Sequence, residues 1–200
     1  MPTGVAIRDP RQQLFDAAER ILLRAGPNAL TSRAVTTEAG CAKGVLHRHF
    51  ADFDAFLAEL VRERIRRLEG QGAALREAAG TGTITGNLTT TLTDLFDPVA
   101  TAVVGLVIAR DELRARLRAT GSKGIPLMTE AAAMLAAYLT AERDLGRLTP
   151  DADIDVLAPT LLGAAHLLYA DREAGMPDED AVSRTVTAVV AGVVRGGEAT

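Results

Sequence analysis

The sequence predicts an all-α protein, with a small N-terminal helix-turn-helix domain followed by a larger helical domain. Apolar residues recur at intervals of three and four along most of the 200 residues, which is the spacing of amphipathic helices. Glycine, proline and aspartate separate these segments, as they do at helix ends. Candidate strands are few, because the β-branched runs are short and lie at helical spacing. With 48% hydrophobic residues, the chain can bury a substantial core in one or two compact domains.

The first predicted helix spans residues 11–25 and has one apolar stripe. The residues of this stripe recur at helical spacing, and they are Leu14, Ala18, Ile21, Leu22 and Ala25. The helix ends at Gly26-Pro27-Asn28, because glycine tolerates left-handed backbone and proline cannot continue a helix.

Two short helices follow, joined by a tight turn. Thr31 stands where its side chain can cap the second helix, and Gly40 closes that helix after barely two turns. The third helix runs over about residues 42–50. It buries Leu46 and Phe50 and exposes Lys43, Gly44, His47 and Arg48, with Val45 and His49 at the boundary. Helices this short need support from neighbours, and a pair joined by a Gly-containing turn is the architecture that places one helix in the DNA major groove.

The exposed side of the third helix has the chemistry of a DNA contact surface. Lys43 and Arg48 are candidates for phosphate contacts, and Gly44 would permit close approach of the backbone. Val45 and His47 would contact base edges or sugar, and Arg33, exposed on the second helix, is a further candidate. The simpler interpretation of this face, taken alone, is a solvated surface on an ordinary helical bundle.

Beyond the fourth helix, which carries Phe56, Leu57, Leu60 and Ile65, glycine and proline mark five further helices. Gly80-Thr81-Gly82-Thr83 is a hinge, and Asp97-Pro98 is a helix start. The expected helices are one through Asn87 to Phe96, one from Pro98 that ends near Arg110 or bends and continues towards Thr120, one from Pro126 to about Arg143, one over residues 153–173, and one from Asp178 to about Arg195.

Charge is distributed unevenly along the chain. Residues 1–50 contain seven Lys/Arg against four Asp/Glu, a balance of +3, whereas residues 51–200 have a balance of −7. This asymmetry is typical of a small basic DNA-binding domain on an acidic body. Four arginines at positions 62, 64, 66 and 67 form a further basic cluster, or a solvated face neutralised by neighbouring glutamates.

The run from Arg11 to about Leu60, about a quarter of the chain, resembles the DNA-binding domain of TetR-family transcriptional regulators, the TetR/AcrR-like repressors. The matching features are a Thr-capped second helix, an Ala-Gly turn, a Lys-Gly pair and a closing Arg-His-Phe, here Thr31, Ala39-Gly40, Lys43-Gly44 and Arg48-His49-Phe50. The sequence departs from the family pattern at four positions. It has Thr36 for the usual alanine, Ala42 for serine, His47 for tyrosine and Phe53 for lysine.

The resemblance implies a helix-turn-helix DNA-binding domain at 8–68, with its motif at about 31–50, and a helical ligand-binding and dimerisation domain at 69–200. It implies a homodimer that binds a palindromic operator in double-stranded DNA and is released by a small, largely apolar inducer, although activation instead of repression stays open. The expected DNA contacts are Thr31, Arg33, Lys43, Gly44, Val45, His47, Arg48 and His49.

The last two predicted helices carry small apolar stripes that could pair with a second copy as a four-helix bundle. These residues are Leu161, Leu162, Ala165 and Leu168 on one helix and Val182, Val186, Val189 and Val193 on the other. The alternative is that both stripes complete the core of a single copy. A helix-turn-helix protein needs two DNA-binding domains to cover both halves of a palindrome, and this need favours the dimer.

Between the DNA-binding residues and the last two helices, apolar side chains could line a ligand cavity with two polar points. The candidates are Phe96, Val103, Leu106, Met128, Met134 and Tyr138, with His166 and Tyr169 as the polar points. At helical spacing such residues more often form plain core. The resemblance favours the cavity, because the C-terminal domain of the family houses an inducer pocket.

The remaining sequence features exclude several other classes of protein. One cysteine rules out an internal disulfide, and no signal peptide or membrane-spanning run is evident, so we expect a cytoplasmic protein with no membrane contact. No catalytic motif, metal site or cofactor is expected. The alternatives are a zinc site at Cys41, His47 and His49, a small all-α enzyme or metal sensor using His166, Tyr169 and Asp171, and an interaction module without DNA binding.

Overall fold

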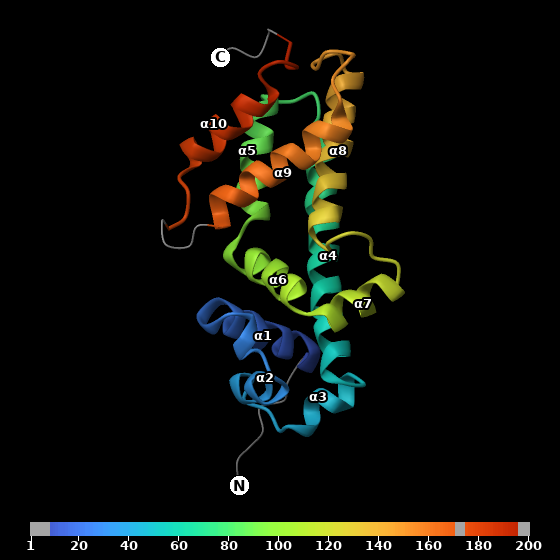
Figure 1. Ribbon diagram of the computed structural model, residues 1–200, viewed down its shortest axis with the longest axis vertical. Coiled ribbons are helices and arrows are strands. Elements are labelled where there is room, and N and C mark those ends of the chain that lie inside the picture. Colours follow the sequence, from blue (N-terminus) through green and yellow to red (C-terminus); the bar gives the residue numbers. More distant parts are fainter. Residues whose placement is uncertain (1–8, 171–174, 196–200) are drawn as a thin grey trace. The chain divides into compact units, whose positions relative to one another are not determined.

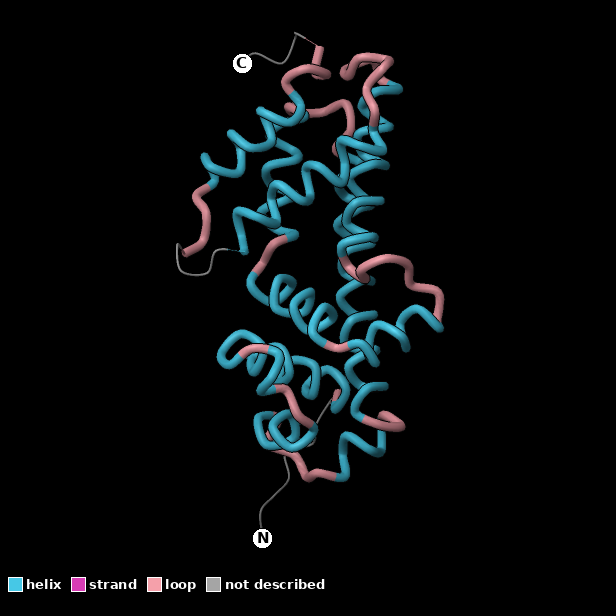
Figure 2. Tube along the Cα trace, in the orientation of Figure 1, coloured by secondary structure: helices cyan, strands magenta, loops and turns pink. Residues whose placement is uncertain are grey.

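The computed structural model describes residues 9–170 and 175–195, which form a chain of helices (Figure 1). Their bounds are α1 Pro10–Ala25, the 3-10 turn η1 Pro27–Ala29, α2 Ser32–Glu38, α3 Gly44–His49, α4 Phe53–Glu77, α5 Ile84–Leu95, α6 Pro98–Ala109, α7 Asp111–Ala119, α8 Met128–Asp144, α9 Ile154–Ala170 and α10 Glu179–Val190. Within the described ranges no strand forms, as Figure 2 shows, so the all-α prediction is confirmed.

The chain divides into two compact units. Unit 1 comprises Met1–Glu63 and Ala102–Ser122, and unit 2 comprises Arg64–Thr101 and Lys123–Thr200. Helices α4 and α6 therefore each begin in one unit and end in the other. This division differs from the continuous 8–68 and 69–200 expected from the sequence, because a distant segment containing α7 packs with the N-terminal helices.

Unit 1 is built on α1, whose start and end follow from local chemistry. Asp9 caps it by accepting hydrogen bonds from the backbone N–H groups of Arg11 and Gln12 at 3.0 and 3.1 Å. Gly26 ends it with φ of 74°, a conformation that disfavours side chains with a Cβ. The stripe expected from the sequence is buried except for Ala25, and Phe15 and Ala17 are buried with it.

The break between α6 and α7 lies at Arg110, whose backbone is extended. Of the two expectations for α6, an end near Arg110 is the one observed, since the helix ends at Ala109. A separate helix, α7, follows, with the acidic residues Asp111 and Glu112 in its first turn. Acidic side chains are favourable at helix N-termini. The Arg110 guanidinium donates a hydrogen bond to the Leu30 carbonyl at 3.0 Å, which ties the break to the loop before α2.

Unit 2 packs α5, α8, α9 and α10 around one apolar core. Inside it lies Glu142, fully buried, whose carboxylate accepts hydrogen bonds from Arg147 at 3.1 and 3.2 Å. The Tyr138 hydroxyl accepts a hydrogen bond from Asn87 at 3.0 Å, and burial together with the neighbouring Glu142 raises the pKa of Tyr138. A buried charge needs such partners, so this network fixes the ends of α5 and α8.

One expected helix end is wrong, and another lies outside the described residues. Helix α10 stops at Val190 and not near Arg195, and the segment after Gly192 lies beside residues 147–149, where Thr149 donates to the Val193 carbonyl at 2.8 Å. Glycine and two β-branched valines favour this extended path over helix. Helix α9 is described to Ala170, and the rest of the predicted 153–173 helix, with Asp171, lies outside the described residues.

Candidate nucleic-acid interface

Helix α2 begins as its sequence predicts. Thr31 is its N-cap, and the hydroxyl oxygen accepts the backbone N–H of Ala34 at 3.1 Å. The hydroxyl hydrogen of Thr31 stays available, and the side chain is exposed, so the cap can also donate to a phosphate oxygen. Thr36, where the related family has alanine, is accommodated because its hydroxyl donates to carbonyl groups one turn earlier, at Ser32 and Arg33.

A tight turn joins α2 to α3. Gly40 has φ of 65°, and Cys41 donates its backbone N–H to the Thr36 carbonyl at 3.0 Å. Helix α3 is two residues shorter at its start than the predicted helix, since Lys43 is its N-cap and no side chain caps it. Ala42 stands where the related family has serine and has no hydroxyl to offer as a cap.

The C-terminal end of α3 is held by an aromatic cluster. Phe50, its C-cap, packs against Phe15 of α1 and Phe56 of α4, with ring centroids 5.8 and 5.1 Å away. Phe15 and Phe56 stack on each other at 5.6 Å. Together with the fully buried Leu46, this cluster decides which side of α3 faces the interior.

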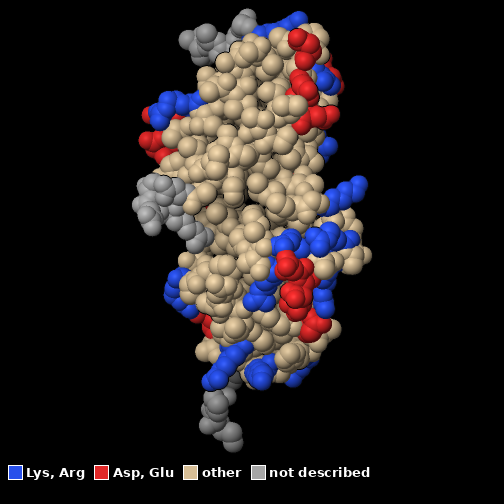
Figure 3. Space-filling view, in the orientation of Figure 1, with Lys and Arg blue, Asp and Glu red and all other residues tan. Residues whose placement is uncertain are grey.

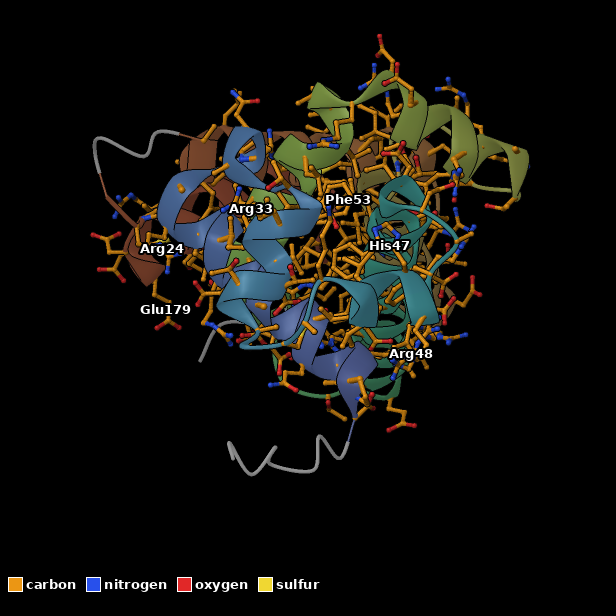
Figure 4. All side chains as sticks on the ribbon, turned by 90° about the horizontal axis from the view of Figure 1, so that it is seen from below. Arg24, Arg33, His47, Arg48, Phe53 and Glu179 are labelled. Carbon is orange, nitrogen blue, oxygen red and sulfur yellow. The ribbon has the colours of Figure 1, made fainter. Side chains whose placement is uncertain are left out.

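The opposite side of α3 is presented to solvent. Six of the eight predicted DNA contacts are exposed, and the other two, Val45 and His49, are half-buried at the edges. The exposed ones are Thr31, Arg33, Lys43, Gly44, His47 and Arg48. Figure 4 looks onto this end of unit 1 and labels Arg33 on α2 and His47 and Arg48 on α3.

The cations of this surface differ from those of α1 in being unpaired. Arg20 and Arg24 of α1 both donate to Glu38 at 2.9 Å, and these hydrogen bonds lower the pKa of that carboxyl. Among the described residues, Arg33, Lys43 and Arg48 form no ion pair. Their charge is therefore available to phosphates, and on the face shown in Figure 3 the end of unit 1 that holds α2 and α3 carries blue Lys and Arg side chains.

The contacts that α7 makes with the turn between α3 and α4 were not predicted from the sequence. Arg116 of α7 pairs with Asp52 at 2.9 Å, and Asp52 also caps α4 by accepting the Ala55 N–H. Arg110 stands 5.7 Å over the ring of Phe53, where the related family has lysine. The arginine-rich run of residues 110–118 was the available signal, but nothing in its periodicity indicates its distant partners.

The predicted ligand residues do not form one group. Val103 and Leu106 are fully buried in the part of α6 that belongs to unit 1, whereas the other six lie in unit 2. Tyr138 is already engaged by Asn87, so as a polar ligand contact it is corrected to a core residue. Met134 packs within 3.0 Å of the position of a Cβ on Gly72, which also places it in the core.

Three of the predicted residues do come together. Phe96 stacks on Tyr169 with centroids 5.1 Å apart, and it lies 5.8 Å from the His166 ring. The Tyr169 hydroxyl and the Nδ1 atom of His166 are buried, and no hydrogen-bond partner reaches either within the described part of the chain. Such orphaned polar atoms are uncommon in protein interiors.

A crevice of about 260 Å³ opens elsewhere in unit 2, between α4 and α5. Its lining is mixed, and it is formed by Gln71, Ala74, Leu75, Ala78, Asn87, Thr90, Thr91 and Asp94. None of the predicted ligand residues lines this crevice.

The predicted dimer residues mostly face the interior of unit 2. Leu161, Leu162, Ala165, Val182 and Val186 are buried in its core, while Leu168, Val189 and Val193 are partly buried against the same core. This burial favours the alternative interpretation, in which the stripes complete the core of a single copy. The apolar residues that α9 exposes lie on its other side, at Val156 and Leu167, which are 57% and 74% exposed.

The zinc alternative finds no support in the described residues. No cluster of three metal-ligating side chains occurs there, including around Cys41, His47 and His49. No single described helix has both the length and the apolar character needed to cross a bilayer, and α5 with α6 meets that test only as a bent pair.

Comparison with known proteins agrees with this geometry. Residues 14–60 match the sequence profile of the tetR family of bacterial regulatory proteins. No curated protein sequence matches the chain significantly.

Among solved structures, the chain is similar to SmeT, the repressor of the Stenotrophomonas maltophilia multidrug efflux pump SmeDEF, with a TM-score of 0.68, 20% identity, and 96% of this chain and 94% of that one covered. It is also similar to the transcriptional regulator FadR from Bacillus subtilis, solved in complex with stearoyl-CoA, with a TM-score of 0.70, 18% identity, and 90% and 98% covered. A gamma-butyrolactone receptor, an ArpA-like protein, gives a TM-score of 0.70 at 20% identity, with 94% and 90% covered. At these identities the likeness shows a common fold.

Proposed function

We propose that this chain is a DNA-binding regulator of the TetR type and not an enzyme, a repressor that binds a palindromic operator and leaves it when a small molecule binds. The match of residues 14–60 to the tetR family of bacterial regulatory proteins supports this proposal. The observation that carries the DNA-binding part is the exposed, unpaired cationic face of α2 and α3 on a helix-turn-helix of the expected geometry.

Each residue of this face has a proposed role. Lys43 and Arg48 bind phosphates, and Thr31 donates its hydroxyl to another phosphate at the N-terminus of α2. Gly44 has no side chain and no neighbour within 4 Å of its Cβ position, which lets the start of α3 approach the groove closely. Val45 and His47 would contact base edges or sugar.

Replacing Arg48 by alanine tests the phosphate role. We expect weaker binding to operator and to random DNA alike, and a salt dependence of log K that is shallower by about 1, because one phosphate contact is lost. Fluorescence anisotropy over a salt series measures both. The matched control is Arg24→Ala, since Arg24 is paired with Glu38; an unchanged slope for Arg48→Ala would make Arg48 a solvated charge only.

A palindromic operator requires two copies of α3, so we propose a homodimer built on α9 and α10. The supporting feature is the outer face of α9, where Val156, Thr160, Gly163 and Leu167 follow one another at helical spacing and are all exposed. Such a face of small and apolar residues lets two helices approach closely. A symmetric interface pairs this face with itself.

The proposed ligand contact is the group of Phe96, His166 and Tyr169. A largely apolar molecule with one polar group would pack against the stacked rings and give the Tyr169 hydroxyl and His166 Nδ1 the hydrogen bonds they lack. The ligand-bound relative, solved with stearoyl-CoA, supports a ligand of this character only by analogy.

The proposed coupling runs along the two helices that the units share. Helices α4 and α6 each continue from unit 2 into unit 1, so a shift of their unit 2 ends displaces their unit 1 ends. At the end of α6, Arg110 bonds the Leu30 carbonyl directly before the α2 cap. Ligand binding would favour a state in which the two copies of α3 no longer fit successive major grooves.

A ligand screen tests this coupling. Compounds that raise the melting temperature are titrated with and without operator DNA, and a coupling of about 1–3 kcal/mol should lower operator affinity about 5- to 150-fold. Linkage requires operator to weaken ligand binding by the same factor. Tyr169→Phe removes the unpartnered hydroxyl. It should weaken ligand binding and leave the operator affinity of the ligand-free protein unchanged. Ligands that bind and leave operator affinity unchanged would refute release while leaving DNA binding intact.

A further inference from the structure

A cleft of about 510 Å³ lies in unit 1 beside the C-terminal end of α3. Its floor is apolar, formed by Phe50 and alanines of the α3–α4 turn and of α4. Its walls carry one arginine from each of three helices: Arg11 of α1, Arg62 of α4 and Arg116 of α7. These arginines are not among the proposed DNA contacts of α2 and α3.

Two of the arginines already converge on one oxyanion. Arg62 donates to Glu59 Oε1 at 2.6 Å, and Arg11 donates to Glu59 Oε2 at 3.4 Å. The other terminal nitrogen of Arg62 donates to the Thr120 hydroxyl at 2.7 Å, while the Arg116 guanidinium donates to Asp52 at 2.9 Å. The cleft is thus arranged to bring guanidinium donors from different helices onto a shared acceptor.

The positive charge of the arginines around this cleft exceeds the negative charge of the neighbouring carboxylates. Three guanidinium groups face Glu59 inside the cleft and Asp52 at its edge. The Arg11–Glu59 contact is long, at 3.4 Å, and among the described residues the Arg116 guanidinium forms an ion pair with one Asp52 oxygen only. Guanidinium groups match phosphate in geometry, and a phosphate offers more oxygens and more charge than one carboxylate.

We propose that this arginine cleft binds a phosphate group. The Glu59 carboxylate would compete with the phosphate for Arg11 and Arg62 and so lower the affinity of the cleft for phosphate. The bound phosphate would join α1, α4 and α7 directly beside the residue that ends α3. It would come either from DNA backbone flanking the operator or from a free phosphorylated small molecule. The proposal does not depend on the function proposed above, because the free phosphate can be tested without DNA.

The test titrates pyrophosphate into the full-length protein at constant ionic strength, with binding followed by calorimetry. Arg62→Gln and Arg116→Gln should each weaken binding about 10-fold, as expected for lost charge-assisted hydrogen bonds. Glu59→Gln should tighten binding several-fold, a change of opposite sign that a loss of folding cannot produce. Arg118→Gln is the matched control, since Arg118 is an exposed α7 arginine outside the cleft.

Two DNA fragments distinguish the sources of the phosphate. One carries the operator alone, and the other extends it by about half a helical turn on each side. A gain in affinity from the extension that Arg116→Gln abolishes identifies flanking DNA backbone, and no such gain, with pyrophosphate binding intact, identifies a free phosphorylated molecule. Absence of pyrophosphate binding in both the unmodified protein and Glu59→Gln, together with no flank effect, would overturn the proposal, whatever the operator affinity.

Discussion

Phe50→Ala is expected to destabilise unit 1 by about 3–5 kcal/mol, the usual cost of truncating a buried phenylalanine. Phe50 is 5% exposed, packs against the rings of Phe15 and Phe56, and has the Arg11 guanidinium 4.7 Å over its own ring. Without it α3 loses its anchor at the C-terminal end, and a helix of six residues cannot persist alone. DNA binding should therefore be lost together with the stability of this unit.

Spectroscopy can assign the effect to unit 1. Both tyrosines, Tyr138 and Tyr169, lie in unit 2 and the chain has no tryptophan, so tyrosine fluorescence reports on unit 2 while circular dichroism reports on all helices. Urea unfolding of Phe50→Ala should show helix loss before the fluorescence change. Phe53→Ala is the control, because the half-buried Phe53 stacks only at the margin of the cluster. An unchanged midpoint would show that Phe50 does not anchor α3.

Leu167→Glu is expected to convert the proposed dimer into monomers and to reduce operator affinity on the order of 100-fold or more, since a second linked half-site contributes 10²–10⁴ in avidity. Leu167 is 74% exposed in a single copy, so the glutamate costs that copy little. In a symmetric interface, two carboxylates would be buried without partners.

Light scattering and operator titration measure the two effects. Leu145→Glu is the control, because Leu145 is also an exposed leucine of unit 2, at 58%, but lies off α9. Monomers for Leu167→Glu and dimers for Leu145→Glu are the expected pair of results. If Leu167→Glu remains dimeric and binds operator as before, the two copies meet through another surface.

The helix-turn-helix of unit 1 was predictable because each of its features depends on residues close together in the sequence. The Thr31 cap, the positive φ at Gly40 and the buried pair Leu46 and Phe50 each follow from a residue and its near neighbours. The placement of α7 was not predictable in this way. Arg110 reaches Leu30 across 80 positions of the chain, and no periodicity encodes such a contact.

The core-facing side of α9 was not predictable for a different physical reason. This helix is apolar nearly all round, with Leu161 buried on one side and Leu167 exposed on the other, and a helix without a polar face does not indicate which side is the core. The packing of the proposed ligand residues was beyond the sequence for another reason: periodicity cannot show that Phe96 stacks on Tyr169 or that Asn87 already bonds Tyr138.

The most direct test of sequence-specific DNA binding by α2 and α3 is an affinity measurement on the full-length protein. It compares DNA selected from a random pool with scrambled DNA of equal length. We predict a palindrome whose half-sites lie about one helical turn apart or a multiple of it, bound about 10³-fold or more tightly than scrambled DNA at physiological salt. Lys43→Ala and Arg48→Ala should weaken both interactions. Equal affinity for selected and scrambled DNA, unaffected by either substitution, would contradict a role of this surface in sequence-specific regulation.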